Sequence, residues 1–109
     1  MDSDSNERRR HRRHKLVCPI TLFGRDGQLL ASASTADLSH GGMYLTVAPD
    51  SIGQADSLNV AFSIPDTADR SMEGFAASAK VIRQEPSEDT DRIGLALQFT
   101  RQMHLPIET

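Results

Sequence analysis

The stretch LNVAFSI at residues 58–64 decides the fold class, because its apolar side chains occupy every second position: Leu58, Val60, Phe62 and Ile64. Successive side chains of a strand point to opposite faces of a sheet, so this alternation predicts a strand with one buried face. Pro65 follows it. Proline cannot donate a hydrogen bond to a sheet, so we expect the strand to end there.

The same period of two recurs along the chain. It predicts five further strands, at residues 16–23, 28–35, 43–47, 74–83 and 93–99. Pro19 lies inside the first of these and favours an edge position or a bulge. No segment has the pattern of a helix. The sequence therefore predicts an all-β fold.

Turn residues separate the predicted strands. Asp26-Gly27 predicts a type I′ hairpin turn between the first two, in which both central residues have positive φ. Residues 37–42 predict a turn-rich corner, and residues 49–57 and 85–92 predict loops. An open sheet of six short strands would leave edges exposed, so closure into a small six-stranded antiparallel β-barrel is the expected solution.

The length of 109 residues and the hydrophobic content of 38% fit one domain with one core. We predict a flexible basic arm at residues 1–15, a barrel at residues 16–100 and a short tail at residues 101–109. The tail is too short to form a stable independent helix. We therefore expect little or no C-terminal helix.

Charge is distributed unevenly along the chain. Residues 1–18 carry six basic and three acidic side chains, a net charge of +3, whereas the remainder carries six basic and twelve acidic ones, a net charge of −6. The arginine-rich arm has no apolar residue between Arg8 and Lys15, so it cannot bury a face of its own. It is the segment that would attract an anion.

Several classes of protein are excluded or disfavoured. Cys18 is the only cysteine, so there is no intramolecular disulfide, and its place in the alternation predicts a buried small side chain. No apolar run is long enough for a membrane span or a signal peptide. The histidines His11, His14 and His40 lack carboxylate or thiolate partners at metal-ligand spacing. We expect a cytoplasmic protein with no catalytic residues, no metal and no membrane partner. The five aromatic residues, Tyr44 included, are expected in the core.

Two groups of residues have the chemistry of a binding site. Arg9 and Arg13 offer planar, two-pronged donors that suit phosphate oxygens and the O6/N7 edge of guanine. Asp37 can accept from the N1 and N2 hydrogens of guanine, and the Ser39 hydroxyl can donate or accept. Gly42 allows a close approach of the backbone. A functionless turn would use the same three residue types, so the second group gains weight only together with the first.

With these two motifs the sequence resembles the PilZ family of bacterial cyclic di-GMP receptors. Residues 7–13 are similar to the first family motif, Arg-x-x-x-Arg, placed on Arg9 and Arg13, with Arg8 and Arg12 as the competing register. Residues 37–42 match the second, Asp/Asn-x-Ser-x-x-Gly, and residues 92–99 are similar to the closing strand of the family. The resemblance covers residues 7–99. It implies a split-barrel fold of the PilZ type.

The resemblance implies a role for each motif residue. Arg9 and Arg13 would close over cyclic di-GMP from the arm, Asp37 and Ser39 would bind guanine from the barrel, and Gly42 would allow the turn. Arg8 would favour a stacked dimer of the ligand. Further candidates for contact are the neighbours of these residues: Arg10, Arg12, His40 and Gly41.

The resemblance also implies a mode of action. Binding would order the arm and create a surface that a downstream partner protein reads, without catalysis. Two alternatives remain. One is a small β-barrel nucleic-acid-binding protein, against which the acidic barrel argues. The other is a protein-binding adaptor with vestigial motifs.

Overall fold

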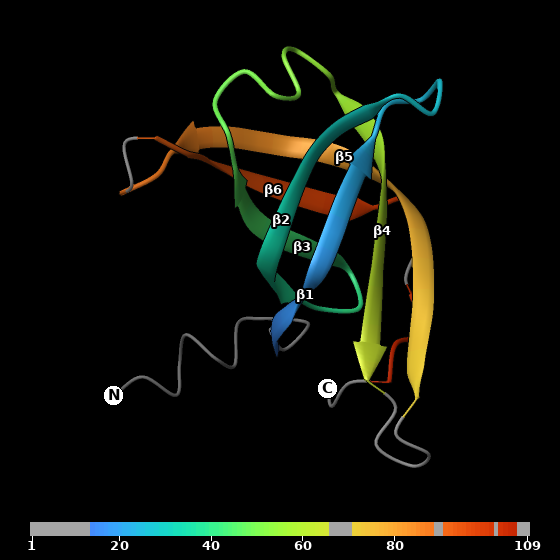
Figure 1. Cartoon of the computed structure of the whole chain (residues 1–109). Helices are drawn as coiled ribbons and strands as arrows, with labels where there is room; N and C mark the ends of the chain where they lie inside the picture. Colours follow the sequence, from blue (N-terminus) through green and yellow to red (C-terminus); the bar gives the residue numbers. More distant parts are fainter. Residues whose placement is uncertain (1–13, 66–70, 89–90, 102, 107–109) are drawn as a thin grey trace, which may run out of the picture.

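Six antiparallel strands account for most of the residues described by the computed structural model of the chain, which are 14–65, 71–88, 91–101 and 103–106. The strands are β1 (His14–Phe23), β2 (Leu29–Leu38), β3 (Gly42–Val47), β4 (Ser57–Pro65), β5 (Met72–Pro86) and β6 (Ile93–Phe99). They close into a barrel in the order β1-β2-β3-β6-β5-β4 (Figure 1). The predicted all-β class, the six strands and the barrel are confirmed.

β1 shows how the alternation of the sequence becomes a barrel wall. Its side chains are alternately buried and exposed, with Ile20 fully buried and Val17 72% exposed. The pairing of β1 with β2 shifts in register between Val17 and Ile20, which places Pro19 in a bulge. A bulge leaves a residue outside the ladder, so the missing N–H of proline costs no hydrogen bond there. Of the two predicted alternatives for Pro19, an edge position or a bulge, the structure has the bulge.

The turn between β1 and β2 differs from the prediction. Gly27 has a positive φ of 87° but Asp26 does not, so this is not a type I′ turn. The Gly27 N–H donates to the Gly24 carbonyl at 2.9 Å, and the Gln28 N–H donates to Asp26 Oδ1 at 3.0 Å. A type I turn followed by a glycine in the left-handed region satisfies this pattern. The side-chain hydrogen bond of Asp26 stabilises the alternative turn.

Three strands extend two or more residues beyond their predicted limits, because pairing with a neighbour continues the ladder. β1 begins at His14, two residues earlier than predicted, and β2 continues to Leu38, so Asp37 lies in a strand and not in the corner. β5 continues to Pro86, where the sequence predicted an acidic loop from residue 85. There Glu85 pairs with Gly94 and Pro86 with Ile93 of β6.

The β1–β2 hairpin joins the rest of the barrel through two short ladders. β1 pairs with β4 over residues 21–23, and β2 pairs with β3 at Asp37–Tyr44 and Leu38–Met43. By contrast, β4 and β5 pair along the whole of β4, from Ser57 to Pro65. The hairpin is therefore held to the barrel mainly by its buried face.

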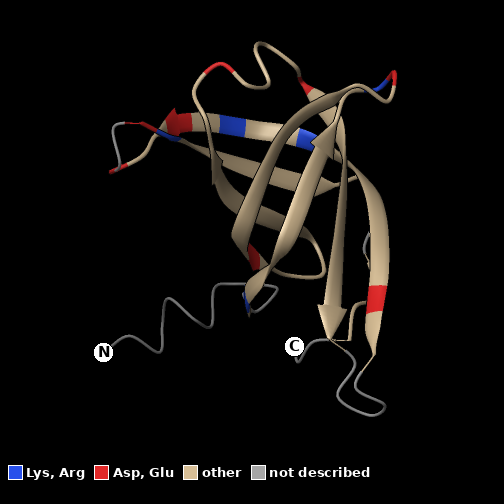
Figure 2. Cartoon of the chain, in the orientation of Figure 1, with Lys and Arg blue, Asp and Glu red and all other residues tan. Residues whose placement is uncertain are grey.

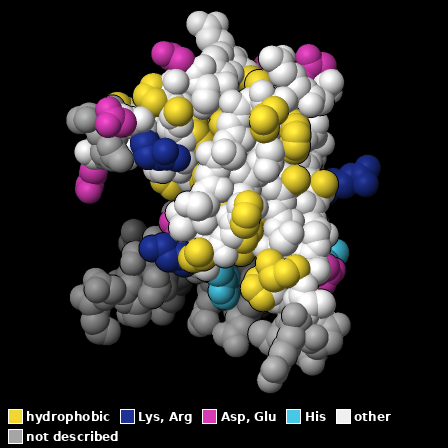
Figure 3. Space-filling view, in the orientation of Figure 1, with side chains coloured by type: hydrophobic (Ala, Val, Ile, Leu, Met, Phe, Trp, Pro, Cys, Tyr) yellow, Lys and Arg dark blue, Asp and Glu magenta, His cyan; other side chains and the backbone are white. Residues whose placement is uncertain are grey.

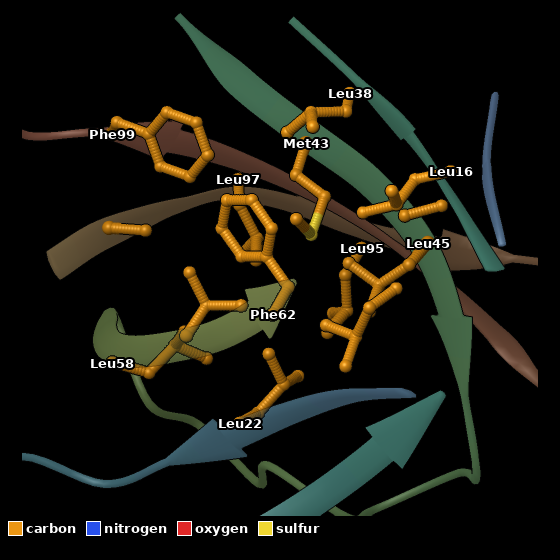
Figure 4. Packing of buried hydrophobic residues seen from close by; sticks show 14 of the residues in the cluster. Leu16, Leu22, Leu38, Met43, Leu45, Leu58, Phe62, Leu95, Leu97 and Phe99 are labelled. Atoms are coloured by element: carbon orange, nitrogen blue, oxygen red, sulfur yellow. The ribbon is translucent and has the colours of Figure 1, made fainter. Parts of the chain in front are cut away.

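The inner faces of all six strands form one hydrophobic core (Figure 4). The Phe62 ring is stacked against Phe75 and Phe99, with centroid separations of 5.6 and 6.4 Å. Cys18 is buried in this core, as predicted. On the face seen in Figure 3, the hydrophobic side chains that reach the surface form small scattered groups.

After β6 the described part of the tail contains no helix, and Leu105 packs into the core with 6% of its surface exposed.

Candidate functional site

The loop from β2 to β3 is shaped by the Ser39 side chain. Ser39 Oγ accepts hydrogen bonds from the backbone N–H groups of Gly41 at 3.3 Å and Gly42 at 3.2 Å. The Ser39 N–H donates to the Gly42 carbonyl at 2.9 Å. Serine in this arrangement replaces a backbone acceptor and holds a tight turn. The motif serine is therefore a structural residue of the loop as well as a candidate contact for ligand.

Gly42 is required for a reason that the sequence did not indicate. Its φ is not in the left-handed region, so the turn itself does not demand glycine. An added Cβ would instead lie less than 3.0 Å from the Leu97 carbonyl oxygen of β6, closer than real Cβ atoms approach. The glycine thus permits the close approach of β3 and β6.

Asp37 stands in a row of residues that crosses the barrel wall. The registers pair Lys15 with Asp37, Asp37 with Tyr44, Tyr44 with Ala96, and Ala96 with Arg83. The row thus runs from β1 through β2, β3 and β6 to β5. Figure 2 shows the acidic band at the end of β2 and the basic bands of β5.

A pocket of about 400 Å³ lies over this row. Its lining comes from β2, β3, β5, β6 and the Ser39 loop: Asp37, Ser39, Gly41, Gly42, Met43, Tyr44, Arg83, Ala96, Leu97 and Gln98. The volume is near the lower end of the range of small-molecule sites. The structure thus brings the predicted residues Asp37, Ser39, Gly41 and Gly42 together on one pocket.

Arg83 and Tyr44 line the same pocket and were not predicted as site residues. Arg83 Nε donates to Glu85 Oε1 in an ion pair. This hydrogen bond lowers the pKa of Glu85, against the opposing effect of burial, and the Arg83 charge and a hydrogen bond with Tyr44 lower it further. The Tyr44 ring extends over Gly94, where a Cβ would collide with its hydroxyl. A small patch of interacting polar side chains therefore covers this wall of the pocket.

Tyr44 and Phe23 correct the expectation that all five aromatic residues belong to the core, because neither belongs to the hydrophobic cluster. Met43, Leu45 and Val47 are buried, so the residues between them face outward, and Tyr44 is one of these. That signal was present in the sequence. The position of Arg83 was not, because a register shift between Val81 and Arg83 decides which β5 residue pairs with Ala96.

His40, a predicted additional contact, has a different environment. Its ring is buried with 9% exposed and is absent from the pocket lining. Nδ1 lies 2.8 Å from the Met103 carbonyl oxygen and 3.3 Å from the Leu105 amide nitrogen. One nitrogen cannot donate and accept at once, and the shorter contact assigns the proton to Nδ1. Nε2 is buried and has no hydrogen-bond partner in the described part of the chain. His40 therefore fastens the C-terminal tail behind the loop.

The predicted arm contacts lie outside the described residues: Arg8, Arg9, Arg10, Arg12 and Arg13. The description starts at His14, which pairs with Leu38 between Asp37 and Ser39. His14, the residue that follows these arginines in the sequence, is thus next to the strand segment that supplies Asp37 to the pocket.

Two further features bear on the class of site. No group of three or more histidine, cysteine or acidic side chains suited to a metal occurs in the part of the chain that the structure describes. A search of the same residues for a helix long and apolar enough to cross a membrane finds none.

Comparison with known proteins identifies the family. The profile of the PilZ domain matches residues 7–106, nearly the whole chain. The chain therefore belongs to the PilZ family, as its two motifs suggested. No curated protein matches the sequence.

Among solved structures, the chain is similar to the Bacillus subtilis inhibitor of motility MotI/DgrA, with a TM-score of 0.65 and 16% identity. The match covers 87% of this chain and 44% of that protein, so this chain spans less than half the length of its structural neighbour. At this identity the similarity establishes the fold.

Proposed function

We propose that this chain is a cytoplasmic, non-enzymatic receptor for cyclic di-GMP. The observation that carries the proposal is that the arginine arm joins β1 at His14, beside a pocket lined by Asp37, Ser39 and Gly42. The two motifs are separated by more than twenty residues of sequence, and the register of β1 with β2 pairs His14, the residue that follows the first motif, with Leu38 of the second. Membership of the PilZ family supports the same ligand.

The chemistry of the two sides of the site is complementary to the ligand. Asp37 supplies an anionic acceptor for the N1 and N2 hydrogens of guanine, and the arm supplies guanidinium groups for phosphates and for O6 and N7. Each charge-assisted hydrogen bond contributes about 1.5–3 kcal/mol, and ordering a segment on binding costs about 2–5 kcal/mol. Several such bonds leave a net affinity in the micromolar range or tighter.

The closed arm and the bound ligand together form a surface that exists only in the complex. We propose that a downstream protein reads this surface, so that the chain acts as a switch. Inhibition of motility is the stated role of MotI/DgrA.

Isothermal titration calorimetry tests the ligand directly. Cyclic di-GMP should give saturable heat with the wild type, and both Arg13→Ala and Asp37→Ala should abolish or greatly weaken it. Arg25→Ala is the matched control, because Arg25 is an exposed arginine of the β1–β2 turn and does not line the pocket. GTP serves as the control ligand.

The stoichiometry and the salt dependence separate the remaining hypotheses. Two ligands per chain, reduced to one by Arg8→Ala, would support the stacked dimer. A steep loss of affinity with salt and no effect of Asp37→Ala would indicate nucleic-acid-type binding to the arm instead. Absence of heat well above micromolar ligand would refute the receptor.

A further inference from the structure

Arg83 lies on the β5 wall of the pocket, across the row from Asp37. Three inter-strand steps separate the two residues, a span of about 14 Å along the sheet at about 4.8 Å per step. The cross-strand neighbour of Arg83 in this row is Ala96, whose side chain is one methyl group. A short carboxylate and a long guanidinium stem therefore stand at the two ends of this row, with Tyr44 and Ala96 between them, and all four residues line the pocket.

The bulge in β5 is what brings an arginine to this place. Val81 pairs with Leu97, and an unshifted ladder would then set Ile82 opposite Ala96, but the shift sets Arg83 there. Bulges are frequent beside functional sites because they redirect a side chain. Here the result is that a cation, rather than the exposed apolar Ile82, lines the pocket.

The ion pair with Glu85 holds Arg83 without saturating it. It engages Nε, one of the five N–H donors of a guanidinium group. The side chains are 57% and 41% exposed, and ion pairs this exposed contribute little to stability. Fold stability therefore gives no strong reason for an arginine here, whereas a ligand in the pocket does.

The hydrogen-bonding groups of Asp37 and Arg83 are complementary to those of guanine. Guanine has hydrogen-bond donors at N1 and N2 and acceptors at O6 and N7, and these groups lie on different edges of the base. An aspartate matches the first pair, and the fork of an arginine matches the second. Adenine has a donor, N6, where guanine has O6, so the same pair of residues would disfavour it.

We propose that Arg83 is a specificity-determining residue that donates to O6 and N7 of the guanine whose N1 and N2 edge is held by Asp37. This inference rests on the proposed function, because it assigns a further contact within the same site. It makes the barrel itself a reader of guanine, in addition to any contact from the arm.

Calorimetry on the full chain tests the proposal with cyclic di-GMP and with cyclic di-AMP, which has the same phosphodiester ring and different bases. Arg83→Ala should weaken cyclic di-GMP binding about tenfold to a hundredfold, the effect of losing one bidentate contact to a base. It should weaken cyclic di-AMP binding less, so the preference for guanine falls. Arg83→Lys should not restore it, because lysine keeps the charge and loses the fork. Arg25→Ala should leave both affinities unchanged.

The outcomes separate this inference from the proposed function. Wild-type cyclic di-GMP affinity in Arg83→Ala, or full recovery in Arg83→Lys, would overturn the reading of guanine by Arg83 and leave the receptor in place. If the wild type itself did not bind cyclic di-GMP, the proposed function would fail, and this inference with it. Thermal unfolding of each variant confirms that the exposed substitution leaves the barrel folded.

Discussion

Replacement of Gly42 by alanine tests whether the motif glycine serves the barrel. The new Cβ would lie less than 3.0 Å from the Leu97 carbonyl oxygen, and would also be 3.3 Å from the Leu97 carbonyl carbon and 3.4 Å from Gln98 Cα. These are backbone atoms of β6, so no side-chain rotation relieves the contact. The ends of β3 and β6 must separate.

The expected cost follows from what this separation disturbs. Overpacking of a buried contact costs about 1–3 kcal/mol. The shift also strains the hydrogen bond from the Phe99 N–H to the Gly41 carbonyl, now 2.9 Å long, and a hydrogen bond contributes about 1 kcal/mol. The free energy of unfolding should therefore fall by about 2–4 kcal/mol. For a domain of this size Tm should fall by about 10–20 °C.

Thermal and urea unfolding measure the effect, with Gly74→Ala as the matched control. Gly74 lies in β5 with nothing within 4 Å of an added Cβ and no positive φ. Alanine there should be neutral or stabilise by about 0.4–1 kcal/mol, because it restricts the unfolded chain. If Gly42→Ala unfolded within about 3 °C of Gly74→Ala, the close approach of the two strands would not be the reason for the glycine.

Two further variants test the roles of His40 and Arg83. His40→Ala should reduce stability by about 1–3 kcal/mol, because it removes the buried side chain that donates to the Met103 carbonyl. Amide exchange should then be faster at Met103, whose N–H donates to the His40 carbonyl at 3.0 Å, and unchanged protection of that amide would contradict the role of His40. Carbon-13 titration of Glu85 should give a pKa below that of an ordinary glutamate, and Arg83→Ala should raise it. Because the pKa of Glu85 is lowered in the folded state, its ionised form stabilises the fold at pH values above the ordinary glutamate pKa, and this contribution is lost as the pH falls through the lowered pKa. An unchanged pKa of Glu85 in Arg83→Ala would refute the pairing.

Much of the fold could be predicted from local pattern. The alternation at residues 58–64 corresponds to β4, and Pro19 marks a bulge, because both depend on properties of the strand itself. The far end of β5 could not be predicted. Its residues Gln84, Glu85 and Pro86 have no apolar alternation, and only the ladder with β6 keeps them extended. The turn type could not be predicted either. Asp-Gly is compatible with both turns, and the two differ in the sign of φ at Asp26.

The candidate site likewise contains residues that the sequence predicts and residues that it does not. Asp37, Ser39 and Gly42 lie within six residues of one another, so a local motif identifies them. Arg83 lies more than forty residues further along the chain and reaches the pocket through a one-residue shift in register. Nothing in the residues around it indicates that shift. The physical role of Gly42 was equally hidden, since it depends on a carbonyl group of β6.

The short ladders that join the β1–β2 hairpin to the barrel give the molecule a preferred line of opening. Segments with few cross-strand hydrogen bonds to their surroundings exchange amide protons through local, not global, unfolding. The hairpin meets its neighbours over residues 21–23 on one side and at Asp37 and Leu38 on the other. The pocket straddles this second junction, with Asp37 on the hairpin and Tyr44 beyond it. A molecule bound in the pocket would bridge the hairpin to the rest of the barrel and raise the free energy needed to detach the hairpin. Amide protection along β1 and β2 would therefore report occupancy of the pocket, although most residues of these strands do not line it.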